Sequence, residues 1–175
     1  RSLVSIGEGA FAFCSSLVSI DLPASLTSIG DSAFQDCSAL TTAAFPAGLT
    51  SIGWRAFACC SSLGSSLVPE SVSPIGSSTF SGCSSLVSLD IPNSAADIGD
   101  AAFQGCSYLT SAIVPESVSD FGDRVFENCV AMLFANISDS AMLVGLSETF
   151  SGCFSLRSVT IIGSVVSLHE QLRWI

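Results

Sequence analysis

The chain has 175 residues, 49% of them hydrophobic, with fifteen acidic residues, five Lys or Arg and a formal net charge of −10. This length fits one domain, and the apolar content is sufficient for a continuous core. The negative charge and the lack of a basic patch argue against binding to nucleic acid or anionic lipid. Polar residues interrupt every apolar run before the roughly 18 residues that a spanning helix needs, so we expect no direct membrane insertion.

Phenylalanine and cysteine recur together at a fixed interval along the whole chain. The first six pairs are 23 residues apart and the last is 24 residues from its neighbour. The pairs are Phe11/Cys14, Phe34/Cys37, Phe57/Cys60, Phe80/Cys83, Phe103/Cys106, Phe126/Cys129 and Phe150/Cys153. A period of this length is typical of a solenoid, in which each repeat forms one coil. We therefore predict a single domain over 1–175 built from about seven 23-residue coils.

Two kinds of local structure are predicted within each coil, which we number from its isoleucine. Ala33, Phe34 and Cys37 have the spacing of one face of a short helix. Ile20 and Leu22 alternate with polar residues, as buried positions of a strand do. Each coil is thus expected to hold one strand and one or two helical turns. The predicted fold class is α/β, with a parallel sheet on a concave face and helical segments opposite.

Each coil is expected to bend at three positions, which hold glycine, a residue that tolerates the left-handed backbone conformation, or proline. Position 2 is glycine in the first six units, as at Gly30, which indicates a positive φ or a close backbone approach. Position 8 holds residues such as Asp36 and Gly82, which tolerate the left-handed conformation that ends a helix. Proline follows each of five strands at position 18, where a missing N–H ends the ladder. These prolines are Pro23, Pro46, Pro69, Pro92 and Pro115.

The combined pattern resembles a known type of leucine-rich repeat. Residues 17–37 read Leu-x-x-Ile-x-Leu-Pro-x-x-Leu-x-x-Ile-Gly-x-x-Ala-Phe-x-x-Cys, which is similar to the unit of the BspA-like (Treponema pallidum-type) family. The resemblance implies a curved α/β solenoid of a kind often found in secreted or cell-surface proteins that bind proteins or cells. The compartment of this chain is not fixed by its own residues.

The ends of the chain depart from the repeat. Met132, Ala135 and Ser138 stand where Leu, Ile and Pro are usual, and residues 163–175 leave the pattern. Terminal units of solenoids are commonly atypical, so we interpret 163–175 as a cap or a truncated unit. Leu3 occupies the repeat position that would end an earlier unit, and the sequence begins with Arg1 instead of an initiator Met. We expect the sequence to be a piece of a longer protein.

The eight cysteines could indicate disulfides or a zinc site. Equivalent residues of stacked coils lie about 4.8 Å apart with parallel side chains, which suits neither a disulfide nor a tetrahedral metal site. We predict that the seven repeat cysteines are free and buried, acting as small hydrophobic residues. Cys59 falls at the outward position 8 and is the one thiol expected to be exposed and reactive.

Two strand positions are predicted to face solvent on the concave side. Position 14 is Ser or Thr in most units, and position 16 varies. Their larger or charged members are the candidate partner-binding residues: Asp21, Leu67, Asp90, Ile113 and Phe134. Phe134 has two interpretations, because a one-residue slip of the irregular sixth unit would turn it inward in place of Ala135.

No catalytic constellation or cofactor motif is present in the sequence. His169 is the sole histidine, and the glycines follow the repeat period instead of a phosphate-binding spacing. We therefore predict a non-catalytic protein-binding module without a cofactor. The alternative is a structural or accessory subunit of a larger assembly, held through Trp54, Tyr108 and Phe154 at outward positions outside the strands.

Overall fold

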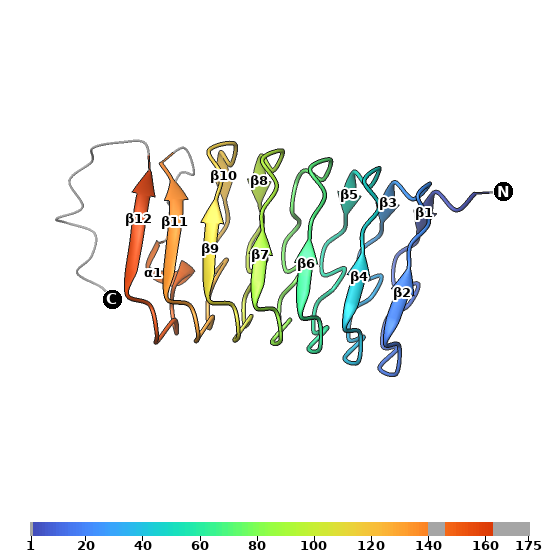
Figure 1. Ribbon diagram of the computed structural model, residues 1–175, viewed down its shortest axis with the longest axis horizontal. Helices are drawn as coiled ribbons and strands as arrows, with labels where there is room; N and C mark the ends of the chain where they lie inside the picture. The colour runs from blue at the N-terminus through green and yellow to red at the C-terminus, as the bar shows by residue number, and fades with distance from the viewer. Residues whose placement is uncertain (1, 140–145, 163–175) are drawn as a thin grey trace.

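The computed structural model describes residues 2–139 and 146–162, except for the side chains of Ser66, Leu67, Leu146 and Ser147. These residues form a rod of stacked coils in which each coil lies beside the next along the long axis (Figure 1). Among them, no helix is long and apolar enough to cross a membrane.

One row of parallel strands runs the length of the rod (Figure 1). Its members are β2 (Ser19–Asp21), β4 (Thr42–Ala44), β6 (Ser65–Leu67), β7 (Ser88–Asp90), β9 (Ser111–Val114), β11 (Phe134–Ser138) and β12 (Ser158–Ile162). Equivalent positions of the repeat pair with one another, as in Ser19 with Thr42 and Ser65 with Ser88. The predicted parallel strands and their register are therefore confirmed. We call the outward side of this row the strand face.

A second row of short strands was not expected from the sequence. It contains β1 (Ser5–Ile6), β3 (Ser28–Ile29), β5 (Ser51–Ile52), β8 (Asp97–Ile98) and β10 (Asp120–Phe121). Ile75 continues the row through single bridges to Ile52 and Ile98. A buried isoleucine or phenylalanine preceded by Ser or Asp is too short a pattern for a strand prediction, because only stacking on identical neighbours extends it.

The predicted helical segments, and with them the α/β class, are wrong. The described residues contain one helix, α1 (Leu146–Thr149), and the segments opposite the long strands are turns. Ser32 and Asp36 have φ of 51° and 59°, whereas an α-helix requires negative φ throughout. The Phe34 amide donates to the carbonyl of Ala56 in the next coil at 2.8 Å. Hydrogen bonds between coils thus replace bonds within a helix, and the fold is a parallel-strand β-solenoid.

The glycine at position 2 is required by close packing between coils. A Cβ on Gly30 would lie 2.7 Å from the Glu8 amide nitrogen, and one on Gly99 would lie 2.6 Å from that of Ser77. Neither glycine has a positive φ. The close-approach alternative is therefore the correct one. Position 8 does adopt the predicted left-handed conformation, as in Asp36, Cys59 and Asn128.

A column of stacked phenylalanines fills the centre of the rod. The rings of Phe11 and Phe34 are 5.1 Å apart and nearly parallel, and the stack continues to Phe126 and Phe150 at 6.0 Å. Phe34, Phe57, Phe80, Phe103 and Phe126 are each 0% exposed. Offset or parallel aromatic contacts add to the large apolar area that each ring buries. The solenoid core is thus continuous along its axis.

Proline sets the length of the long strands. Pro23 and Pro46 follow three-residue strands, whereas β11 reaches Ser138 at the proline position and has five residues. The missing N–H of proline ends the ladder in the regular coils.

The structure describes about six turns of the solenoid instead of the predicted seven, five of them complete and the sixth up to residue 139. They begin at Ile6, Ile29, Ile52, Ile75, Ile98 and Phe121. The seventh unit contributes β12, while its start and the predicted cap at 163–175 lie outside the described residues.

Candidate functional site

The candidate residues lie on the strand face, as their period-two alternation with buried residues predicts. Asp21 and Asp90 are exposed at the ends of β2 and β7, and Ile113 on β9 is 60% exposed. Asp90, Ile113 and Phe134 occupy three successive coils, whereas Asp21 lies three coils before Asp90. The side chain of Leu67 is outside the described part of the structure. The five residues therefore do not converge on one point.

Phe134 faces outward in register with its neighbours. It pairs with Ser111 on one side and Ser158 on the other, and its side chain is 43% exposed. Ala135 is fully buried next to it. The sixth unit therefore keeps its register, and an aromatic ring stands in a column of small hydroxyl side chains.

The row of long strands is interrupted at two places. Ladders join β2 to β4, β6 to β7, and β9 to β11 and β12, but no ladder joins β4 to β6 or β7 to β9. At the second junction the Thr110 amide lies 3.4 Å from the Val87 carbonyl, whereas the equivalent bond from Leu133 to Thr110 measures 2.8 Å. The strands separate at these junctions, and a hollow lies over each.

The hollow between β7 and β9, which we call the β7/β9 groove, has a volume of about 430 Å³. Its lining includes the apolar residues Leu89, Ile91 and Ile113 and the acidic residues Glu70 and Asp90. Sequence reasoning found Asp90 and Ile113 but missed Glu70 and the groove itself. The repeat pattern carries no signal for a local break in a ladder.

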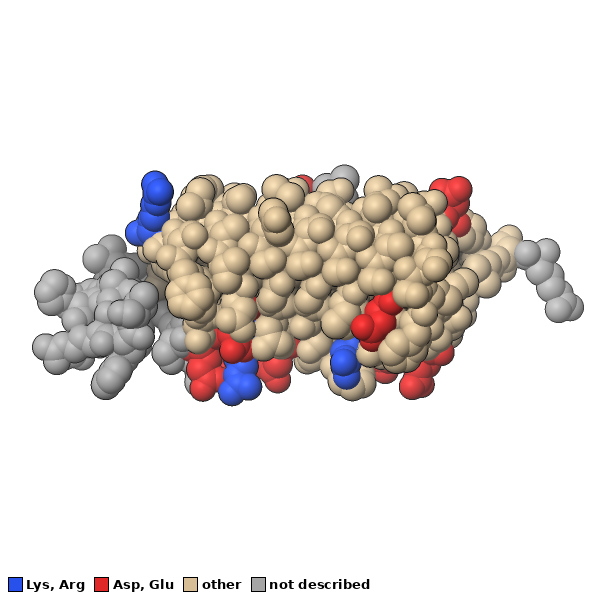
Figure 2. Space-filling view, turned by 90° about the horizontal axis from the view of Figure 1, so that it is seen from below, with Lys and Arg blue, Asp and Glu red and all other residues tan. Residues whose placement is uncertain are grey.

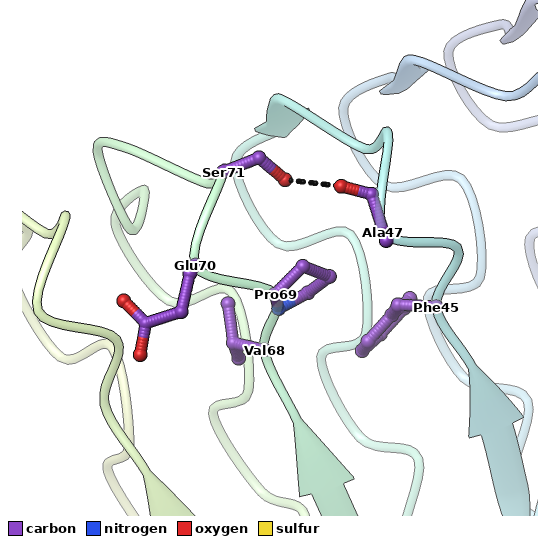
Figure 3. Close-up of a pocket in the computed structure, with 6 residues that line it drawn as sticks. All are labelled: Phe45, Ala47, Val68, Pro69, Glu70 and Ser71. Atoms are coloured by element: carbon purple, nitrogen blue, oxygen red, sulfur yellow. Dashed lines mark hydrogen bonds between the residues drawn. The ribbon is translucent and has the colours of Figure 1, made fainter.

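A shallower hollow just beyond the ends of β4 and β6, the β4/β6 depression, has a volume of about 690 Å³. Phe45, Val68 and Pro69 form its apolar lining, and Ser71 on its rim donates to the Ala47 carbonyl at 2.9 Å (Figure 3). Phe45 stands where other coils have an aliphatic residue, and its ring meets Phe57 edge-on at 5.3 Å. Glu70 is the one charged residue of its lining, so the depression is a largely apolar surface.

The cysteine column is a ladder of buried thiols, and all eight cysteines are free. Each thiol from Cys37 onward in the repeat donates to the main-chain oxygen of a phenylalanine in the preceding coil at 3.1 to 3.3 Å. Burial raises the pKa of Cys60 and of Cys106 to about 12. These thiols stay protonated at neutral pH and hold the coils together. They are hydrogen-bond donors as well as small apolar groups.

Cys59 is exposed as predicted, but it is not the one exposed thiol. Cys14 is exposed as well, because it belongs to the first coil and no earlier coil of the described residues covers it. Partial burial, with a contribution from the Asp36 carboxylate, raises the pKa of Cys59. Cys59 is therefore less readily ionised than a free thiol.

The edge where the chain enters the long strands forms a second candidate surface, the turn edge. It consists of residues 14–18, 37–41, 60–64, 83–87, 106–110 and 129–133, none of which is charged. Figure 2 views the rod from this side, with most charged groups along one margin, a few at the other and an uncharged middle. Tyr108 is 64% exposed here, and Phe154, two coils further on, is 88% exposed. Trp54, at 48% exposure, lies on the opposite turns beside Arg55.

No group of three or more His, Cys, Asp or Glu residues is placed to hold a metal ion in the described ranges 2–139 and 146–162. His169 lies outside those ranges.

Stacked coils with parallel strands and a 23-residue period define a leucine-rich repeat protein. The family model for the BspA type leucine rich repeat region (6 copies) matches residues 1–108 and 50–172. The chain therefore belongs to the BspA-type leucine-rich repeat family, whose members generally serve as protein-interaction modules and are typically non-enzymatic.

Two solved structures illustrate the similarity. The leucine-rich repeat protein of Treponema pallidum is 34% identical with a TM-score of 0.78, over 89% of this chain and 72% of that one. A leucine-rich cell surface protein from Faecalibacterium prausnitzii shares the fold at 22% identity and a TM-score of 0.54, over 93% of this chain and 58% of that one. No curated protein matches the chain.

Proposed function

We propose that this chain is a non-catalytic module that binds a partner protein through the C-terminal half of its strand face. The observation that carries the proposal is the exposure of Ile113 and Phe134 on adjacent strands, where the other coils, apart from Leu67, place small or polar groups. Neither side chain is buried in the core. Apolar and aromatic side chains on a surface of this kind are typical anchors of protein interfaces.

The charge of the strand face supports a protein partner over a nucleic acid. The long strands and the turns that follow them carry Asp21, Glu70, Asp90, Glu116 and Asp139 and contain no Lys or Arg. A polyphosphate backbone would be repelled by such a surface. Secretion or display at the cell surface is part of the proposal, in line with the description of the Faecalibacterium prausnitzii relative as a cell surface protein.

The test uses Phe134→Ser and a matched exposed aromatic, Phe154→Ser. Proteins captured from the source cells by the immobilised wild-type chain are identified, and the affinity of a purified partner is then measured for both variants. We expect Phe134→Ser to weaken binding about tenfold or more, as for an interface anchor, and Phe154→Ser to leave it unchanged. Equal affinity of wild type and Phe134→Ser would contradict the use of this face.

A structural role in a larger assembly is the second candidate, and the uncharged turn edge favours it. Tyr108 and Phe154 stand exposed two coils apart along that edge. In that case Tyr108→Ser and Phe154→Ser would release the chain from the assembly, and Phe134→Ser would not.

A further inference from the structure

The β7/β9 groove combines an apolar floor with carboxylates at its rim. Leu89 and Ile91 are 7% and 9% exposed beneath it, and the 60% exposed Ile113 forms one wall. Glu70 and Asp90 are both exposed and reach the groove from different coils. Figure 3 shows the Glu70 carboxylate directed away from Phe45 and Val68, out of the β4/β6 depression. Glu70 therefore stands on the ridge between the two hollows and directs its charge away from the depression.

This arrangement matches the side chain of arginine or lysine. Such a side chain has a long aliphatic stem that packs on apolar surface and a cationic head that seeks carboxylates. A metal ion is a poorer fit, since Glu70 and Asp90 belong to no group of three potential ligands among the residues placed by the structure. The long strands and the turns after them contain no Lys or Arg. No basic side chain of the strand face therefore neutralises these two carboxylates.

The β4/β6 depression supplies a second contact at a defined distance. Two strand spacings separate the two junctions along the rod, which corresponds to about 10 Å. An extended chain advances about 3.3 Å per residue, so it covers this distance in about three residues. The apolar lining of Phe45, Val68 and Pro69 would accept an aliphatic side chain.

We propose that the strand face binds an extended segment of a partner protein, with an arginine or lysine in the β7/β9 groove and an apolar side chain about three residues away in the β4/β6 depression. The proposal rests on the protein-binding function proposed above and names the chemistry of the partner. The acidic strand face would also attract such a segment at long range.

The probe is a random 12-residue peptide library displayed on phage and selected on the purified wild-type chain. We expect the enriched peptides to carry a basic and an apolar residue about three positions apart. Synthetic versions should lose about tenfold in affinity for the double variant Glu70→Gln/Asp90→Asn. They should also bind more weakly as the salt concentration rises.

Glu8→Gln is the matched control, because Glu8 is an exposed carboxylate in the turn after β1, away from the long strands and outside the groove lining. Its affinity for the peptides should equal that of the wild type. Circular dichroism and melting of each variant establish that the fold is retained.

Enriched peptides that lack a basic residue, or that bind the Glu70→Gln/Asp90→Asn variant as tightly as the wild type, would overturn the proposal. Failure to enrich any peptide would overturn it as well. If enriched peptides that bind the Glu70→Gln/Asp90→Asn variant normally lose affinity for Phe134→Ser, the strand face still binds protein and only the assignment of the groove fails. Loss of the captured partner on Phe134→Ser with no enrichment of peptides would lead to the same conclusion.

Discussion

The column of stacked phenylalanines, which forms the spine of the rod, repeats strictly, whereas the strand face varies from coil to coil. In the spine, Phe80 stacks on Phe57 and Phe103 at 5.7 Å on both sides, and the same contact recurs from coil to coil. On the strand face, the ladder breaks twice and equivalent positions differ, as Ser111 and Phe134 do. A stacked core requires the same residue in each coil. The strand positions that differ from coil to coil can therefore hold partner-binding residues.

The largest effect should come from the spine. Phe80→Ala removes a fully buried ring between two others and is expected to destabilise the fold by about 3–5 kcal/mol. Phe150 is only half-buried and stacks on Phe126 at 6.0 Å, so Phe150→Ala should cost clearly less. Urea denaturation of both variants measures the difference. Equal losses would show that stability is not graded along the rod.

The thiol ladder predicts a loss of stability at alkaline pH. Burial raises the pKa of Cys60 and Cys106 to about 12 from an ordinary value of 9.0. The folded state holds these protons more tightly than the unfolded chain does. This contribution to stability is therefore complete below pH 9 and is lost as the pH rises toward 12, by about 1.4 kcal/mol per pH unit for each thiol.

Denaturation midpoints between pH 8 and 10.5 test the role of the thiols. Above pH 9, stability should fall less steeply with pH in Cys106→Ala than in the wild type. The difference should equal the contribution of one thiol, because the variant lacks one buried proton. Ser15→Ala, at an exposed residue that does not titrate in this range, should leave the slope unchanged. A slope that is the same in all three proteins would contradict the ladder's contribution.

Most of the architecture followed from periodicity, because the spacing of Phe, Cys, Gly and Pro reports directly on stacking. The replacement of the expected helical segments by turns in the described regular coils did not. Ala33, Phe34 and Cys37 point inward from a turn just as they would from a helix, and the left-handed φ of Ser32 has no signature in a serine. Of the candidate site, the outward residues were predictable. The groove was not, since it depends on ladder bonds that fail between particular coils.

A smaller effect distinguishes the two exposed thiols. Folded protein should react with a bulky thiol reagent at Cys14 and Cys59, and the six buried thiols should remain unmodified until the chain unfolds. Partial burial and the Asp36 carboxylate raise the pKa of Cys59, which slows its reaction at neutral pH. Asp36→Asn should accelerate Cys59 alone, as mass spectrometry of the labelled peptides would show. Modification of three or more thiols in the folded state would refute the buried ladder.

The separation of stability from recognition is tested most directly by making one substitution twice in the same coil. Phe126 is 0% exposed and stacks on Phe103, whereas Phe134 is 43% exposed on the strand face. Urea denaturation of Phe126→Ser and Phe134→Ser gives the two free energies of unfolding. We predict a loss of about 3 kcal/mol or more for Phe126→Ser and less than about 1 kcal/mol for Phe134→Ser. Comparable losses would mean that Phe134 is a structural residue and would contradict the assignment of the strand face to binding.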